Sequence, residues 1–285
     1  MRKHIFFILL FFGCGWGLLS TTAQEDILAA KPLDNIFTKE HIANKKPIPY
    51  PSIRESDIMW SKRVWRVIDL REKMNLPLYY PVEFQDDRFS LIGLFLYGIE
   101  NEGLQAYSAA DDEFSATISW DDVQKVMGAG TEMQMVTNPE TGMQSEIPVS
   151  IDPRVEDVKQ LLVKEVWYFD KNYSRMDVRI LGICPIREYA NEAGEMVKSQ
   201  TFWIYFPEAR DLMARHEVFN ASNDAQRRSF DDDFIKRYFG SYITQETNVY
   251  NNRNIESYAV GIDAILEAQR IKYEIFTFEH DLWQF

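Results

Sequence analysis

Residues 51–81 read PSIRESDIMWSKRVWRVIDLREKMNLPLYYP and decide how the predicted fold begins. Ser52 followed by Glu55 has the spacing of a helix capping box, and neither Gly nor Pro occurs again until Pro77. Apolar residues then recur at helical spacing. They are Ile53, Trp60, Val64, Val67 and Met74, with Ile58, Trp65 and Ile68 on one flank. This pattern predicts a helix over residues 53–75, with a broad apolar side that other elements cover.

The same stretch resembles a known protein family. The run MWSKRVWRVIDLREKMNLPLYYP, residues 59–81, is similar to a segment of the GldN/PorN family. Four later segments agree with it. They are VWYFDKNYSRMDVRILGICPI (166–186), FWIYFPEAR (202–210), SFDDDFIKRYFGSYITQETNVYNN (229–252) and IFTFEHDLWQF (275–285). The resemblance spans nearly the whole chain after its first residues, and it rests on many aromatic and charged positions.

The resemblance implies a non-enzymatic scaffold of the type IX secretion and gliding machinery that needs no cofactor. The implied place is the periplasm, at the inner side of the outer membrane. There such proteins bind a GldK/PorK-type lipoprotein in a ring of several copies and contact the periplasmic region of GldM/PorM. The motor pair GldL/PorL and GldM/PorM is thereby coupled to the ring. The implied function is to support protein secretion and, in gliding species, adhesin movement.

The first residues have the pattern of a cleaved signal peptide. A basic start at Arg2 and Lys3 precedes an apolar run over residues 5–19 and the small-residue sequence ending at Ala23. We therefore expect residues 1–23 to be removed. The net charge of −13 then becomes −15, because both lost charges are basic. Such an acidic chain is unsuited to nucleic acid, whose phosphates select clustered Lys and Arg. No later apolar stretch has the ~20 residues of a membrane span.

Cysteine content excludes a disulfide within the mature chain. Cys14 leaves with the predicted leader, which leaves Cys184 alone. A lipid anchor on Cys14 is the alternative, but the bulky residues before it and the apolar sequence after it disfavour that reading. Cys184 lies in RILGICPI, a strand-like apolar run, so we expect a buried, inert thiol rather than an intermolecular bridge or a nucleophile.

The remaining pattern predicts an α+β fold with one domain over residues 51–285. Residues 24–50 are expected to form an extended arm, either as a loose leader or docked on a neighbouring copy. Residues 51–150 read as helix-rich and 151–285 as strand-rich and then helical, so a subdivision near residue 150 stays open. Predicted helices follow Asp87, Ser119, residue 207, Ser229 and residue 255. The expected strands are a hairpin over 131–137 and 143–149 and an antiparallel meander over 161–170, 176–188 and 197–206.

No motif for metal, phosphate or nucleophilic chemistry is present in the sequence. His41, His216 and His280 are isolated, and the EHDLW cluster reads as local hydrogen bonding. The acidic groups 111–113 and 231–233 lack the spacing of a calcium loop, and the second is typical of a helix N-terminus. A secreted glycan-binding protein or hydrolase that uses such a carboxylate pair is the alternative function.

Aromatic and arginine side chains are therefore the candidate contact residues. Core packing is the more common role of any single tryptophan, but the set as a whole favours a protein interface. Arg63 and Arg66 lie on the less apolar side of the predicted helix and suit pairing with carboxylates of a partner. The candidate interface residues are Trp60, Arg63, Trp65, Arg66 and Trp283.

Overall fold

The stretch predicted as a helix over 53–75 is a β-strand. In the computed structural model of the chain, a short 3-10 helix, η1 (Glu55–Asp57), leads into strand β1 (Ile58–Asp69). Ser52 makes no cap there. Five consecutive residues from Val64 to Ile68 are buried, as in a strand covered on both faces. The helix prediction was wrong because β1 is buried on both sides, which blurs the alternation that identifies a strand.

The structure describes residues 41–85, 88–137, 144–191, 193–220, 223 and 225–282. The predicted leader and the predicted arm up to residue 40 lie outside these residues. Residues 41–285 form one compact unit.

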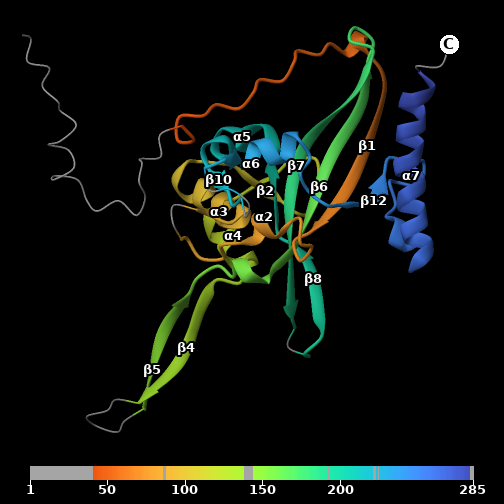
Figure 1. Cartoon of the computed structure of the whole chain (residues 1–285). Coiled ribbons are helices and arrows are strands. Elements are labelled where there is room, and N and C mark those ends of the chain that lie inside the picture. The colour runs from red at the N-terminus through yellow and green to blue at the C-terminus, as the bar shows by residue number, and fades with distance from the viewer. Residues whose placement is uncertain are drawn as a thin grey trace, which may run out of the picture. The chain divides into compact units, whose positions relative to one another are not determined.

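One antiparallel sheet of eight strands organises this unit (Figure 1). Its order is β12-β1-β6-β7-β9-β2-β3, with β8 also paired to β7. Besides β1, the strands are β2 (Ala106–Ser108), β3 (Thr117–Ile118), β6 (Val158–Asp170), β7 (Arg175–Ala190), β8 (Met196–Gln200), β9 (Phe202–Tyr205) and β12 (Tyr242–Glu246). The longest strands, β1, β6 and β7, lie side by side in the middle of the sheet. β1 is thus paired on both edges, with β6 and with β12.

The predicted meander is confirmed, with one break in its third strand. β6 and β7 match the expected ranges and pair antiparallel along most of their length. The expected strand over 197–206 divides at Thr201 into β8 and β9. The backbone N–H and the hydroxyl of Thr201 both donate hydrogen bonds to the carbonyl of Pro185, at 3.0 and 2.9 Å. Thr201 is therefore held at the point where β8 ends and β9 begins.

Four of the six α-helices that the structure describes begin within a few residues of a predicted start. In chain order the helices are α2 (Leu76–Tyr79), α3 (Leu91–Asn101), α4 (Trp120–Val126), α5 (Phe206–Arg215), α6 (Phe230–Ile235) and α7 (Ile262–Asp281). The four are α3 to α6, whereas α2 was not predicted and α7 begins later than expected. Ser119 caps α4, and Ser229 with Asp232 forms the predicted capping box of α6. Ser90, not Asp87, caps α3, and Asp87 lies outside the described residues. Residues 255–257 form a 3-10 turn, η3, and α7 starts only after Gly261, whose φ of +64° breaks the helix.

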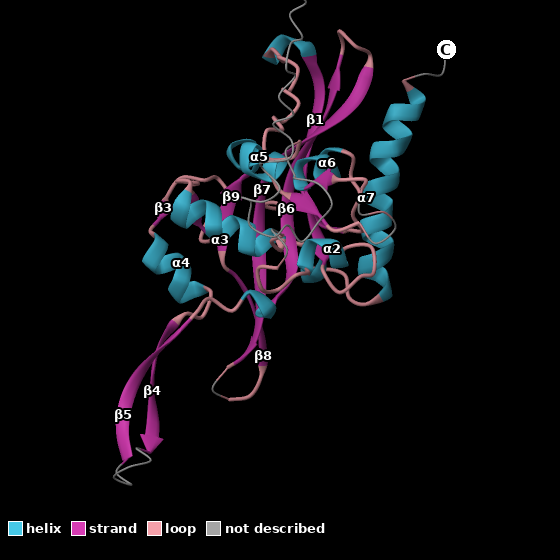
Figure 2. Cartoon of the chain, turned by 60° about the vertical axis from the view of Figure 1, so that its left-hand side comes forward, coloured by secondary structure: helices cyan, strands magenta, loops and turns pink. Residues whose placement is uncertain are grey.

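Two small sheets complete the fold. The predicted hairpin is confirmed as β4 (Gly130–Thr137) paired with β5 (Gln144–Ile151), and this pair forms a sheet of its own. β10 (Glu217–Val218) pairs with β11 (Arg228–Ser229). With its central sheet and its helices, the chain has the predicted α+β class (Figure 2).

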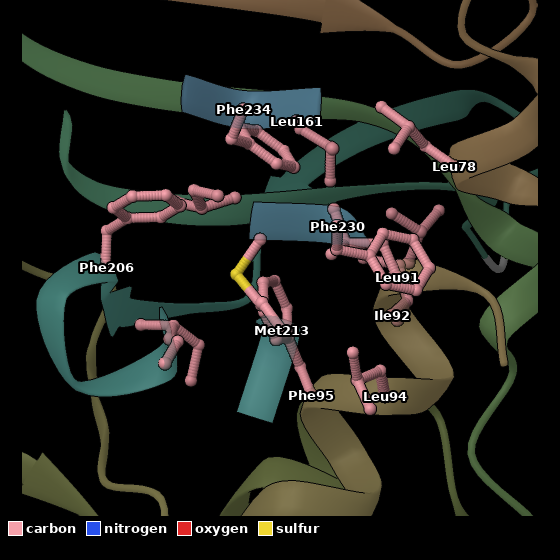
Figure 3. Close-up of a cluster of buried hydrophobic side chains, with 14 of the residues drawn as sticks. Leu78, Leu91, Ile92, Leu94, Phe95, Leu161, Phe206, Met213, Phe230 and Phe234 are labelled. Atoms are coloured by element: carbon pink, nitrogen blue, oxygen red, sulfur yellow. The ribbon is translucent and has the colours of Figure 1, made fainter. Parts of the chain in front are cut away.

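The main core lies between one face of the sheet and helices α2, α3, α5 and α6. Figure 3 shows side chains from these helices meeting Leu161 of β6. Those labelled there are Leu78, Leu91, Ile92, Leu94, Phe95, Phe206, Met213, Phe230 and Phe234. All are buried. At about 25 cal/mol per Å² of apolar surface, this cluster supplies a large share of the free energy of folding.

Two further clusters cover the rest of the sheet. On its other face, Trp65, Cys184 and Trp203 pack together under the loop that carries Phe114. Burial raises the pKa of Cys184 to about 12, so the prediction of a buried thiol is confirmed. At the β12 edge, Val64 and Ile243 pack against Ile271 and Ile275 of α7. Helix α7 therefore covers one edge of the sheet, and the described residues leave its opposite side uncovered.

Candidate interaction surface

Trp60 packs within the fold, against the C-terminal helix. Its ring stacks on Phe278 of α7, with the ring centroids 4.7 Å apart. Trp60 is half-buried and borders the cluster under α7. Its contact with α7 explains its place on the strand, because an aromatic pair of this kind adds about 0.5–1.5 kcal/mol beyond area burial.

Arg66 belongs to a buried charge network. It donates to Glu165, which is fully buried, and Arg237 donates to the other carboxylate oxygen of Glu165 at 2.8 Å. The indole N–H of Trp167 donates to Glu165 as well, at 2.8 Å. Burial alone raises the pKa of Glu165, but the charges of Arg66 and Arg237 and these hydrogen bonds outweigh it, so its pKa is lowered. The guanidinium of Arg66 thus forms its ion pair within its own chain.

Trp65 faces the opposite side of the sheet, where it binds the acidic group 111–113. Its indole N–H donates to Asp112 at 2.7 Å, and the ammonium of the buried Lys164 lies 3.1 Å from the same carboxylate. Phe114, in the left-handed region at φ +58°, brings its ring close to Gly182. A side chain at Gly182 would occupy the place of that ring. The loop over 111–114 therefore closes this face of the sheet.

Strand geometry separates the five candidate interface residues. Trp60 and Arg66 lie on the face toward α7, whereas Arg63 and Trp65 lie on the other. Arg63 has an exposed side chain. Trp283 lies outside the described residues. Arg63 is therefore the described member of this set that a partner reaches without displacing part of the fold.

The second acidic group is also used by the fold. Asp231 is buried and pairs with Arg210, with Nε and Oδ1 at 2.8 Å. Asp232 caps α6 and accepts from Lys45. Asp233 is buried near Arg228, and desolvation raises its pKa to about 6. Asp231 and Asp232 are thus engaged by the fold, and Asp233 lies 3.6 Å from Nε of Arg228.

Residues that could hold a metal do not gather in the described part of the chain. No group of three or more His, Cys, Asp or Glu side chains has a suitable arrangement there. His216 packs between rings, 5.4 Å from Phe89 and 6.2 Å from Tyr97, and burial lowers its pKa. His280 lies 3.8 Å from Asp281. Over the same described residues, none of the helices has both the length and the apolar character that crossing a bilayer requires.

An exposed apolar surface follows α7 and the residues before it. We call it the α7 surface. It comprises Val260, Ile262, Ile265, Leu266, Tyr273 and Phe276, whose side chains are 59–82% exposed. Beside it a groove of about 500 Å³ runs between β12 and the start of α7, lined mainly by Ile243, Ile255, Ala259, Ala264 and Ile265. Large exposed apolar patches of this kind mark contact sites.

The pattern that predicts a helix after residue 255 does not show that Ile262, Ile265 and Leu266 form an exposed surface. Helix α7 has two apolar sides. Its buried side uses Ala268, Ile271 and Ile275, which pack on the sheet. The signal was present in the sequence, because apolar residues surround this helix more widely than one covered side requires.

The comparison with protein families identifies the chain. The model of a family described as gliding motility associated protein GldN matches residues 53–284, which is most of the sequence. The chain belongs to the GldN family. Membership makes it a component of the gliding motility and type IX secretion machinery. The resemblance seen in the sequence is thereby confirmed. A search of curated proteins found no match.

Proposed function

We propose that this GldN-family protein is a non-enzymatic scaffold in the periplasm, held at the inner side of the outer membrane by its partners. In this proposal it binds a GldK/PorK-type lipoprotein, several copies assemble into a ring with that lipoprotein, and the ring contacts the periplasmic region of GldM/PorM. The family match over residues 53–284 is the observation that carries the proposal.

The structure supports a role based on protein contacts. The first part of the α7 surface, Val260, Ile262, Ile265 and Leu266, and the groove beside it present apolar side chains that the described fold leaves uncovered. Interfaces between proteins combine such an apolar centre with a polar rim that contains Arg. Arg63 offers an exposed guanidinium on the sheet face away from α7. We propose that these two separate surfaces are the ones that contact partners.

Deletion of the gene tests the functional part of the proposal. We expect loss of secretion of proteins that carry C-terminal sorting domains, and restoration by a plasmid copy. We also expect the purified protein to co-elute with the lipoprotein in size-exclusion chromatography. Normal secretion in the deletion strain, together with separate elution of the two proteins, would contradict the scaffold role.

Charge reversal tests whether Arg63 contributes to this binding. Arg63→Glu is expected to weaken binding of the lipoprotein about tenfold, because a rim guanidinium that meets a carboxylate becomes a like charge. Arg154→Glu is the matched control, since Arg154 is also exposed and is not part of β1. Affinities are measured by surface plasmon resonance. Equal effects of both variants would assign the loss to net charge and not to Arg63.

A further inference from the structure

The C-terminal half of α7 carries a row of exposed rings. Tyr273 and Phe276 are 68% and 59% exposed, with ring centroids 6.2 Å apart, and His280 continues the row 6.4 Å from Phe276. A hollow of about 450 Å³ lies beside them, lined by Gln269, Arg270, Lys272, Tyr273 and Phe276. This surface therefore presents exposed rings and, beside them, a hollow that can accept a ring from another molecule.

These residues have the spacing of a two-helix seam. Gln269, Tyr273, Phe276 and His280 are separated by steps of four, three and four residues, which places them along one line of a helix. The buried Ile271 and Ile275 belong to the opposite side. We propose that this line is an interface with a second copy of the same chain, in which the two α7 helices pair antiparallel about a two-fold axis between Glu274 and Ile275.

Charge determines which partner and which register fit. With the axis at that point, Tyr273 lies opposite Phe276 of the second copy, so the ring of each copy enters the hollow of the other. Lys272 then lies beside Glu279 of the second copy, and symmetry repeats this pair. Within the described part of the chain, Lys272 and Glu279 form no ion pair. The second copy therefore supplies opposite charges on both sides of the aromatic contact.

Other registers of the same helix pair fit less well. Nearly full overlap of the two helices, with the axis at Ile271, would bring Lys272 beside Lys272 of the second copy on one flank of the seam and Arg270 beside Arg270 on the other. Like charges at these positions are destabilising. A shift toward the start of α7 would pair Asp263 with Arg270. Arg270 is already bound by Glu267, with Nη2 and Oε1 at 2.6 Å, and by Glu274. The register that joins Lys272 to Glu279 is the one that uses uncommitted charges.

The contact goes beyond the proposed function, because it concerns the chain alone and not its partners. A two-fold contact uses the same patch on both copies and therefore pairs them. It does not generate a ring, which requires a different, head-to-tail surface. Self-pairing and secretion can consequently fail independently of each other.

The test measures self-association of the chain without residues 1–23 by sedimentation equilibrium over a range of concentrations. We expect a reversible dimer. Lys272→Glu alone and Glu279→Lys alone each introduce two like-charge contacts and should raise the dissociation constant about tenfold. The double variant Lys272→Glu/Glu279→Lys exchanges the charges and should restore wild-type association to within about twofold. Phe276→Ala should weaken it as well, because the ring fills the hollow.

Controls and contrary outcomes follow from the geometry. Lys236→Glu reverses an exposed charge outside α7 and should leave association unchanged. Circular dichroism checks that each variant keeps its fold, since the changed side chains are on the surface. A monomer at every accessible concentration would overturn the proposal. A dimer that both single variants weaken but the double variant does not restore would overturn the register and with it the interface.

Discussion

Glu165 is a fully buried carboxylate that two elements distant in sequence neutralise. Arg66 comes from β1 and Arg237 from the segment after α6, so the three residues join the sheet to a helix that covers it. Replacing one member of a buried ion pair leaves uncompensated charge in the interior. The network therefore holds the segment that follows α6 against the sheet. The free-energy cost of burying these charges is small only while all three residues are present.

Glu165→Gln is expected to lower the free energy of unfolding by about 3–5 kcal/mol, because both guanidinium groups lose their counter-charge. Urea denaturation monitored by tryptophan fluorescence measures the change. Glu274→Gln is the matched control, since Glu274 pairs with Arg270 on the surface and should cost less than about 1 kcal/mol. Similar values for both variants would show that burial does not strengthen the Glu165 network.

Asp233 should make stability depend on pH in the direction opposite to that of a typical ion-paired carboxylate. Its pKa in the folded protein is about 6, above the ordinary value of 3.8, because burial disfavours the charged form. The folded state therefore holds a proton that the unfolded state releases between about pH 4 and pH 6. This contribution to stability is present at low pH and is lost as the pH rises through 6.

Asp233→Asn removes this titration. The free energy of unfolding of the variant, relative to that of the wild type, should increase from pH 4.5 to pH 7, because only the wild type must then bury a charged carboxylate. Urea denaturation of both proteins at the two pH values measures it. A difference that is the same at both pH values would contradict a raised pKa for Asp233.

At the scale of elements, β1 shows the limit of local patterns. Its apolar residues at positions 60, 64 and 67 fit a helix, yet positions 60, 62, 64, 66 and 68 form one face of a strand. The sequence pattern fits both a helix and a strand, because Trp65 and Val67 are apolar and buried on the other face of the strand as well. The better signal was composition, since branched and aromatic residues from Val64 to Ile68 favour strands. What decides the element is its pairing with β6 and β12, which no local pattern contains.

Helix α7 offers the clearest test of an element, because its two sides have opposite exposure. Ile271→Ala should lower the free energy of unfolding by about 2–4 kcal/mol, since Ile271 is fully buried against the sheet edge. Ile265→Ala is the control on the exposed side and should change it by less than about 0.5 kcal/mol. Chemical denaturation measures both. Equal costs would mean that the exposed side of α7 also packs on the chain.

At the scale of the whole molecule, the sequence predicted the fold class, the meander, the hairpin and the helices capped by Ser119 and Ser229, but not the strand that follows the Ser52 pattern. Each of these rests on neighbouring residues, such as Ser229 with Asp232, so a local pattern was sufficient. Contacts across long separations could not be predicted. The side chain of buried Asn75 forms hydrogen bonds with both the N–H and the carbonyl of Gly240, at 2.8 and 3.0 Å. The sequence near either residue contains no pattern that predicts this pair.

The choice of candidate interface residues was limited in the same way, because it depended on a local helix pattern. Four of them were placed on a helix, Trp60 and Trp65 on its apolar side and Arg63 and Arg66 on its less apolar side, whereas the strand puts Trp60 with Arg66 on one face of the sheet and Arg63 with Trp65 on the other. Trp60, Trp65 and Arg66 proved to be contacts within the chain, which is the more common role of such residues. Family membership, in contrast, was visible from sequence, because it depends on the identity of many residues and not on their conformation.

The arrangement of the three longest strands has a mechanical consequence. β1, β6 and β7 run antiparallel beside one another over 12, 13 and 16 residues. A force applied along the strand direction shears the whole hydrogen-bond ladder at once, so the bonds share the load. A force at right angles to it, at the β12 edge, breaks them one after another. In the proposed scaffold role, this chain is expected to resist tension best when it is pulled lengthwise along its central strands.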